Sequence, residues 1–308
     1  MMADNNSLVG GEFSRRKIND KVIIVQLLVM IFLCINILLL ITFLKKEGFY
    51  TTTRYILFAV MLLSDSIILI MSDILLILSY FQFTMHIWLC IIISFVVLLY
   101  FVVTPVTLTV MTLERYVAIC MPLRHGELCT TRSTMNCILI IHCLSSVPCI
   151  VIFSMYFASA SLRIYKQYSV CSVEIFILYR WHDHVRSAVY QFYFLIMCIC
   201  IVFSYVKIMK VAKAASGENK KSTWKGLRTV ILHAFQLLLC LIQLWCPIIE
   251  SAILQINLRL FVDVRYFNYI TFSLAPRCLS PLIYGLRDEK FFHALKSYAF
   301  FGLFKINI

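Results

Sequence analysis

The chain passes from a long apolar run into adjacent charges at Met111-Thr-Leu-Glu-Arg-Tyr-Val-Ala-Ile-Cys-Met-Pro-Leu-Arg-His125. Where a helix enters water, Glu114 can neutralise Arg115 beside it, and Arg115 can instead bind carbonyl groups or a partner chain when neighbouring helices move apart. Tyr116 follows directly. Pro122 cannot continue a helix and biases the residue before it towards extended geometry. We therefore expect the helix to end close to Pro122 and to lead into a basic loop.

The composition indicates an integral membrane protein. Hydrophobic residues make up 62% of the 308 residues, only 14% are charged, and mean hydropathy is +0.90. Soluble domains are about 45–50% apolar. Stretches without Asp, Glu, Lys or Arg recur at 22–44, 133–162, 187–206, 229–249 and 266–276.

The longest apolar stretch, 55–113, is broken only by Asp65 and Asp73. Because one spanning helix needs about 20 apolar residues, this stretch holds two helices joined near Phe81–Trp88. The total number of spanning helices is seven. The last one has the weakest sequence signal, because its apolar run is short and Arg277 sits inside the span; without it the count is six. The sequence predicts an all-α membrane protein, a seven-transmembrane helix bundle.

Three parts of the chain follow from this count. We expect an extracellular N-terminal tail over 1–21, the seven-transmembrane domain over 22–286, and a cytoplasmic tail over 287–308. The tail is expected to form a short amphipathic eighth helix at the inner surface.

The stretch that begins at Met111 resembles the Met-Ala-Tyr-Asp-Arg-Tyr-Val-Ala-Ile-Cys-x-Pro-Leu string of odorant receptors, a branch of the rhodopsin-like G-protein-coupled receptors. Here Thr112-Leu113 replaces Ala-Tyr and Glu114 replaces Asp, and neither replacement changes the pairing of an acid with an arginine. Lys225-Gly-Leu-Arg-Thr-Val-Ile-Leu-His233 and Ser280-Pro-Leu-Ile-Tyr-Gly-Leu-Arg-Asp288 resemble later odorant receptor motifs, the second of the fish type. The resemblance covers essentially the whole span from Asn36 to Phe291.

Orientation is predicted from Lys and Arg, which concentrate on the cytoplasmic side of membrane proteins. With the C-terminal tail inside, seventeen of the 28 Lys and Arg residues fall on the inner side, in 45–54, 115–132, 207–228 and 287–305. Ten fall outside, including the group in 15–21. The majority predicts an external N-terminus, where Asn5 is an N-glycosylation acceptor. The net charge of +13 then indicates binding to acidic membrane lipid and a docking surface, with no nucleic acid.

Polar residues inside the apolar stretches predict a core network. Asn36 needs a hydrogen bond inside the bundle, and Asp65 is costly enough at its depth to be a functional candidate. The resemblance places both on the polar network between helices one, two and seven, where the Asp commonly holds a sodium ion. The last helix departs from the pattern, with Ser280 for an Asn and an unexpected Arg277. We expect Arg277 to pair with Asp65, and sodium binding is the alternative.

The resemblance also implies an activation switch that couples to the G protein. It makes Tyr205 a partner of Arg115 in the active state, whereas interfacial anchoring is the alternative. Trp245-Cys-Pro247 combines an indole with a helix-breaking proline, which predicts a hinge. The predicted switch residues are Glu114, Arg115, Tyr116, Tyr205, Trp245 and Tyr284.

The thirteen cysteines are an odd number, so at least one is unpaired. Cys90 and Cys171 stand apart from the rest in outer segments, and the resemblance implies a disulfide between them that holds the long loop over the mouth of the bundle. His182 and His184 flank Asp183 without a third ligand in view, so we expect no metal site. No cofactor is expected.

The ligand pocket is expected in the outer half of the bundle. The resemblance places in it Leu98, Phe101, Val102, Val189, Tyr193, Trp245, Ile248, Ile249 and Ala252. Most are apolar, so plain helix packing is the alternative for each. Two partners are possible for Glu250: a ligand amine or other cation, or an outer arginine such as Arg259 or Arg265. We favour the salt bridge with an arginine.

The sequence therefore predicts a plasma membrane receptor that binds a small water-borne odorant and activates a heterotrimeric G protein. The resemblance implies the stimulatory olfactory type, cyclic AMP and the cilia of olfactory neurons. The alternative is a non-olfactory rhodopsin-like receptor for a small amine, lipid or peptide. No nucleophile–base set appears at one depth, so no catalysed reaction is expected.

Overall fold

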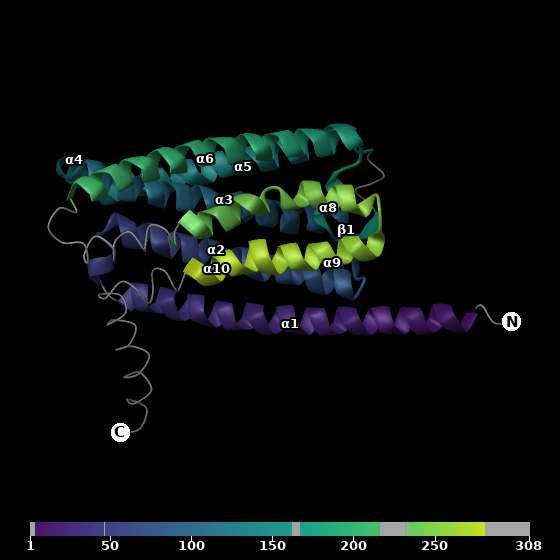
Figure 1. Cartoon of the computed structure of the whole chain (residues 1–308). Helices are drawn as coiled ribbons and strands as arrows, with labels where there is room; N and C mark the ends of the chain where they lie inside the picture. Colours follow the sequence, from purple (N-terminus) through teal and green to yellow (C-terminus); the bar gives the residue numbers. More distant parts are fainter. Residues whose placement is uncertain (1–3, 46, 162–166, 216–231, 233, 281–308) are drawn as a thin grey trace, which may run out of the picture.

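The computed structural model describes residues 4–45, 47–161, 167–215, 232 and 234–280. Within them, long helices lie side by side in one bundle (Figure 1). The long helices are α1 (Asp4–Lys45), α2 (Thr53–Tyr80), α3 (Ile87–Cys120), α5 (Thr131–Ser159) and α6 (Arg180–Ala215). The all-α prediction is confirmed, apart from two three-residue strands.

The sixth and seventh spans are less regular. Residues 234–243 are helical and, after a turn at Leu244–Trp245, continue as α8 (Cys246–Leu254). The chain then forms α9 (Leu258–Asn268), a π-helix (Tyr269–Leu274) and α10 (Ala275–Ser280) without a break. Among the described residues, six helices are long and apolar enough to cross a membrane. The segment α9 to α10 lies where the seventh was expected, and the expected eighth helix lies outside the described residues.

Proline and side-chain caps explain the ends of several helices. Met121 leaves helical geometry with φ −136° and ψ 58°, so α3 ends at Cys120, two residues before Pro122, close to where it was expected to end. The expected basic loop is instead a short helix, α4 (Pro122–Leu128), because proline is favoured at the first position of a helix. At the start of α5, the Thr130 side chain accepts a hydrogen bond from the Ser133 amide.

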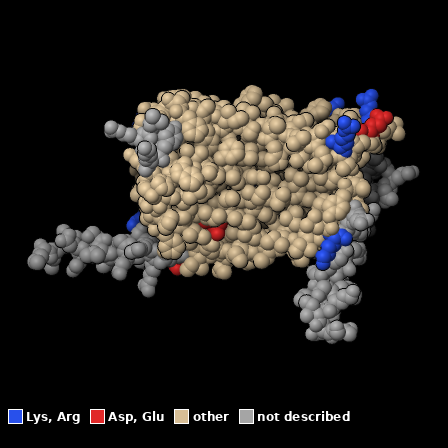
Figure 2. Space-filling model, turned by 180° about the vertical axis from the view of Figure 1, so that it is seen from behind, with Lys and Arg blue, Asp and Glu red and all other residues tan. Residues whose placement is uncertain are grey.

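The core is centred on α3, which packs against α2, α5 and α6. Val102, Leu108 and Met111 are at most 2% exposed there. The opposite pattern holds on the outside of α5, where Leu139 and Ile150 are at least 60% exposed. Apolar side chains therefore lie on both sides of the helices, as expected when lipid is the solvent. On the face seen in Figure 2, few charged side chains lie between the two ends of the bundle.

The two ends of the bundle carry different structures. One end holds the antiparallel strands β1 (Thr84–His86) and β2 (Tyr168–Val170), with Met85 opposite Ser169, and a 3-10 turn over Val173–Phe176. We call it the disulfide end. The other end holds α4 and the end of α3, and we call it the Arg115 end (Figure 1).

Candidate functional site

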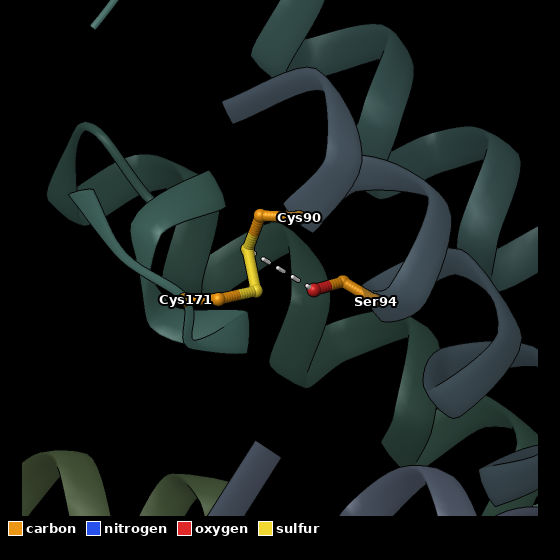
Figure 3. Close-up of a disulfide and its surroundings, with 3 residues drawn as sticks. All are labelled: Cys90, Ser94 and Cys171. Atoms are coloured by element: carbon orange, nitrogen blue, oxygen red, sulfur yellow. Dashed lines mark hydrogen bonds between the residues drawn. A yellow bond between two sulfur atoms is a disulfide. The ribbon is translucent and has the colours of Figure 1, made fainter. Parts of the chain in front are cut away.

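A disulfide between Cys90 and Cys171 joins the first turn of α3 to the residue after β2, with the two Cα atoms 5.4 Å apart. Both residues are at most 2% exposed, and the Ser94 hydroxyl lies 3.7 Å from the Cys90 sulfur (Figure 3). The predicted disulfide is confirmed. It fixes β2 and the turn that follows to the central helix, so the residues just after Cys171 are held close to the bundle.

Charged and neutral polar side chains from three helices and this turn meet at the disulfide end. We call them the acid–base cluster; its members are Glu174, Asp183, Arg186, Glu250, Ser251, Arg265 and Asn268. On α6, Arg186 donates to the Asp183 carboxylate, and the Ser251 hydroxyl of α8 donates to its second oxygen at 2.9 Å. These contacts tie α6 to α8. They also bury Arg186, whose side chain is 9% exposed.

Arg265 on α9 is shared between two carboxylates of the cluster. Its Nη1 atom lies 2.9 Å from Glu174 Oε1, and its Nε atom lies 3.9 Å from Glu250 Oε2. The Asn268 amide donates to Glu250 Oε1 at 3.0 Å. The sequence left Arg259 and Arg265 as alternatives for Glu250, and Arg265 is the arginine in contact.

The Glu174 carboxyl lies beyond the membrane-spanning helices, and its pKa shows the balance of forces there. Partial burial raises this pKa, whereas the Arg265 charge, the turn's backbone amide and the Ser172 hydroxyl lower it. The lowering contributions are larger together, so the pKa lies below its usual range. Glu174 is therefore held as a carboxylate beside Arg265.

The polar core lies in the middle of the bundle. Asp65 on α2 is fully buried, and its Oδ1 atom lies 3.7 Å from Nε of Arg277, whose side chain is 1% exposed. Arg277 Nη1 also donates to Gln243 Oε1 and to the Ser273 carbonyl, both at 2.6 Å. Thr104 donates to Asp65 Oδ1 at 3.1 Å. The structure thus brings Asp65 and Arg277 together, with neutral groups around them.

The other two members of the predicted network are placed differently. Asn36 is fully buried on α1, and its amide nitrogen and oxygen have no hydrogen-bond partner among the described residues. The Ser280 side chain is not among those described. Sequence reasoning missed Gln243, which binds both Arg277 and the Ser273 hydroxyl. A buried glutamine in an apolar helix is a signal that would have found it.

At the Arg115 end, the Glu114 carboxylate lies 3.3 Å from Nε2 of His125 in α4. From the sequence, only the neighbouring Arg115 was expected as a partner of Glu114. The Tyr116 ring packs on Phe203 of α6, with centroids 5.6 Å apart. Two residues further along α6, Tyr205 has a buried hydroxyl. The switch residues of α3 and α6 therefore lie on facing helices, whereas Tyr284 lies outside the described residues.

The residues predicted to line a pocket do not share one environment. On α3, Leu98 and Val102 are buried and Phe101 packs on Tyr190 of α6 with ring centroids 5.8 Å apart. Tyr190 was missed; it is 2% exposed one position after Val189, which is half-buried.

Tyr193 and the expected pocket residues of the sixth span lie in varied surroundings, and their place in a ligand pocket stays a prediction. The Tyr193 hydroxyl donates to the Leu144 carbonyl of α5 at 2.6 Å, so it points towards that helix. Trp245 is 40% exposed and Ile249 is 42% exposed. Also in α8, Ala252 is exposed and Ile248 is half-buried.

Comparison with known proteins finds similarity to seven-transmembrane receptors. The family described as 7 transmembrane receptor (rhodopsin family) matches residues 35–284. Odorant receptor 131-2 of Danio rerio is 46% identical over 305 residues, which is 99% of this chain and 93% of the relative. Galanin receptor 2a of the same fish is 25% identical over 218 residues, 66% of this chain and 56% of the relative.

Proposed function

The chain belongs to the rhodopsin family of seven-transmembrane receptors, and from this premise we propose that it is an odorant receptor coupled to a heterotrimeric G protein. The observation that carries the proposal is the 46% identity to a zebrafish odorant receptor over 99% of the chain. As a member of this family it is a multi-pass membrane receptor and not an enzyme. A small water-borne odorant is its ligand, and the stimulatory olfactory G protein and cyclic AMP follow from activation.

The orientation belongs to this proposal. We place the disulfide end outside the cell and the Arg115 end in the cytoplasm of olfactory neuron cilia, because the sequence puts most Lys and Arg on the inner side. An external N-terminus makes Asn5 available for N-glycosylation. Removal of N-linked glycans should then increase the mobility of the wild-type chain in an electrophoretic gel and leave Asn5→Gln unchanged.

Activation is proposed to move the sixth span away from α3. Pro247 and the turn at Leu244–Trp245 supply the hinge, since a proline interrupts the hydrogen bonds of the helix. Arg115 then leaves its resting contacts to meet Tyr205 and the G protein. The Glu114–His125 contact supports this proposal, because it ties the end of α3 to α4 where the G protein would dock.

The buried Arg277 is proposed to replace a sodium ion in the polar core. Its guanidinium lies beside Asp65, which is where a cation would otherwise be attracted. Ligand affinity should therefore be the same in sodium and in a bulky organic cation of equal ionic strength. Clear sodium dependence of ligand affinity would refute this part of the proposal.

The coupling proposal is tested in cells that carry a cyclic AMP reporter and the stimulatory olfactory G protein. Water-soluble odorants should raise cyclic AMP, and Arg115→Ala should abolish the response with surface expression intact. Arg132→Ala is the matched control, because Arg132 is an exposed arginine at the same end, in α5. A retained response in Arg115→Ala would refute the switch. A response confined to peptides or lipids would favour a non-olfactory receptor.

A further inference from the structure

We propose that the acid–base cluster at the disulfide end recognises the ligand and that the ligand is a small organic cation, a primary amine that also carries a neutral hydrogen-bond acceptor. The inference rests on the proposed receptor function and adds the chemical class of the ligand. It assigns the ammonium group to Glu250 and the acceptor to Arg186.

The charges of the cluster do not balance. Asp183 is matched by Arg186, whereas Glu174 and Glu250 share the single guanidinium group of Arg265. One negative charge therefore remains among the joined side chains. Because buried charges are expensive without a partner, such a group of residues favours the binding of a cation.

The contacts identify which carboxylate lacks a full partner. Asp183 receives hydrogen bonds from Arg186 and Ser251. Glu174 has Arg265 at 2.9 Å, whereas Glu250 has only the same arginine at 3.9 Å and a neutral amide. The Glu250 side chain is nevertheless only 16% exposed. Glu250 is therefore the carboxylate for which an ammonium group would supply the missing ion-pair partner.

Arg186 supplies an independent reason to expect a bound molecule. Its side chain is 9% exposed, its Nη2 atom is used by Asp183, and its Nε atom has no hydrogen-bond partner among the described residues. Arg186 belongs to the cluster through its contact with Asp183, and its charge also acts on Glu174 and Glu250. A buried unpaired donor favours a ligand with an acceptor. The three nearby acids disfavour a carboxylate in that role.

A purely structural role makes different predictions. The cluster also holds the turn after Cys171 and three helices together, and in that role any loss of charge lowers stability without selecting a ligand. If Glu250 binds an ammonium group, Glu250→Gln and Arg265→Gln must have opposite effects on amine affinity. The first removes the partner, and the second removes the competing guanidinium. If the cluster is only structural, both variants should instead have a lower amine affinity.

The experiment uses the full-length receptor in lipid nanodiscs and four probes of equal chain length. They are pentylamine, 5-aminopentan-1-ol, pentan-1-ol and pentanoic acid, with dissociation constants from ligand-dependent thermal stabilisation. We expect the amino alcohol to bind most tightly, then the amine, with the alcohol and the acid weaker by about tenfold or more. Glu250→Gln should weaken both amines by about tenfold or more. Arg265→Gln should strengthen both.

Two further variants sharpen the assignment. Arg186→Lys keeps the positive charge but removes the Nε–H donor, so the advantage of the amino alcohol over pentylamine should disappear. Arg259→Gln is the matched control: Arg259 is exposed at the start of α9, and amine affinity should stay unchanged.

The inference is overturned if neither amine binds, if the alcohol or the acid binds as tightly, or if Glu250→Gln and Arg265→Gln change amine affinity in the same direction. Nucleotide exchange on the G protein separates the two proposals. Amine binding without nucleotide exchange would refute coupling and leave the ligand class standing. Exchange driven only by the alcohol or the acid would refute the ligand class and leave coupling standing.

Discussion

Two ion pairs in the same molecule differ in almost every physical respect. Asp65 and Arg277 in the middle of the bundle have side chains 0% and 1% exposed, whereas Glu174 and Arg265 at the disulfide end have side chains 45% and 48% exposed. The buried pair is wrapped by neutral donors and acceptors from several helices. The exposed arginine is shared between two acids.

The contrast shows what each pair is suited to do. A buried pair must stay complete, because removing one partner leaves a charge in a low-dielectric interior that water cannot reach. A half-exposed pair loses little when a partner leaves, because water replaces it. The polar core is therefore suited to hold the helices in place, and the disulfide end is suited to exchange partners with a ligand.

The largest expected effect is at Arg277. Arg277→Ala should destabilise the receptor by about 3–5 kcal/mol, because it leaves Asp65 without its cation. The loss should appear as low expression and a large fall in the melting temperature of the purified protein.

The double variant Asp65→Asn, Arg277→Ala should recover part of that loss, since no charge then remains buried. Arg259→Ala serves as the control, because Arg259 is exposed. If Arg277→Ala melts like the wild type, the contrast between the two pairs is wrong.

A smaller effect is expected from the disulfide, which lies next to the acid–base cluster. Cys90→Ser with Cys171→Ser should lower stability by about 2–4 kcal/mol, because the bond closes a loop of 81 residues. Amine affinity should fall as well, since Glu174 follows closely after Cys171. Thermal melting and ligand titration measure the two effects. Equal affinity with and without the disulfide would show that the cluster does not depend on it.

The smallest effect is expected from protonation of Glu174. The folded-state pKa of this carboxyl lies below its usual value, so its contribution to stability is present above about pH 4.3 and is lost as the pH falls through the folded-state pKa. The loss should be about 1 kcal/mol or less, because the pair is half-exposed. Melting temperatures of wild type and Glu174→Gln should converge in acid. A difference that persists at low pH would assign Glu174 another role.

The helices were predictable because their cause is local. Each spanning segment must satisfy its own backbone hydrogen bonds within lipid, so an apolar run such as 22–44 or 133–162 has little choice of structure. Pro122 similarly ends α3 by covalent geometry alone. The need of Arg277 for an acid was also visible in the sequence, because a guanidinium in an apolar segment requires a partner. The disulfide followed from family resemblance.

Other contacts were decided by tertiary packing. Arg259 and Arg265 are six residues apart in the sequence, and only the placement of α9 against α8 selects Arg265 for Glu250. Packing of α4 against the end of α3 likewise brings His125 to Glu114. The Trp245 indole, at the turn that interrupts the sixth span, is 40% exposed. These outcomes depend on the rotation and depth of whole helices, which many weak contacts set together, and no single stretch of sequence contains that information.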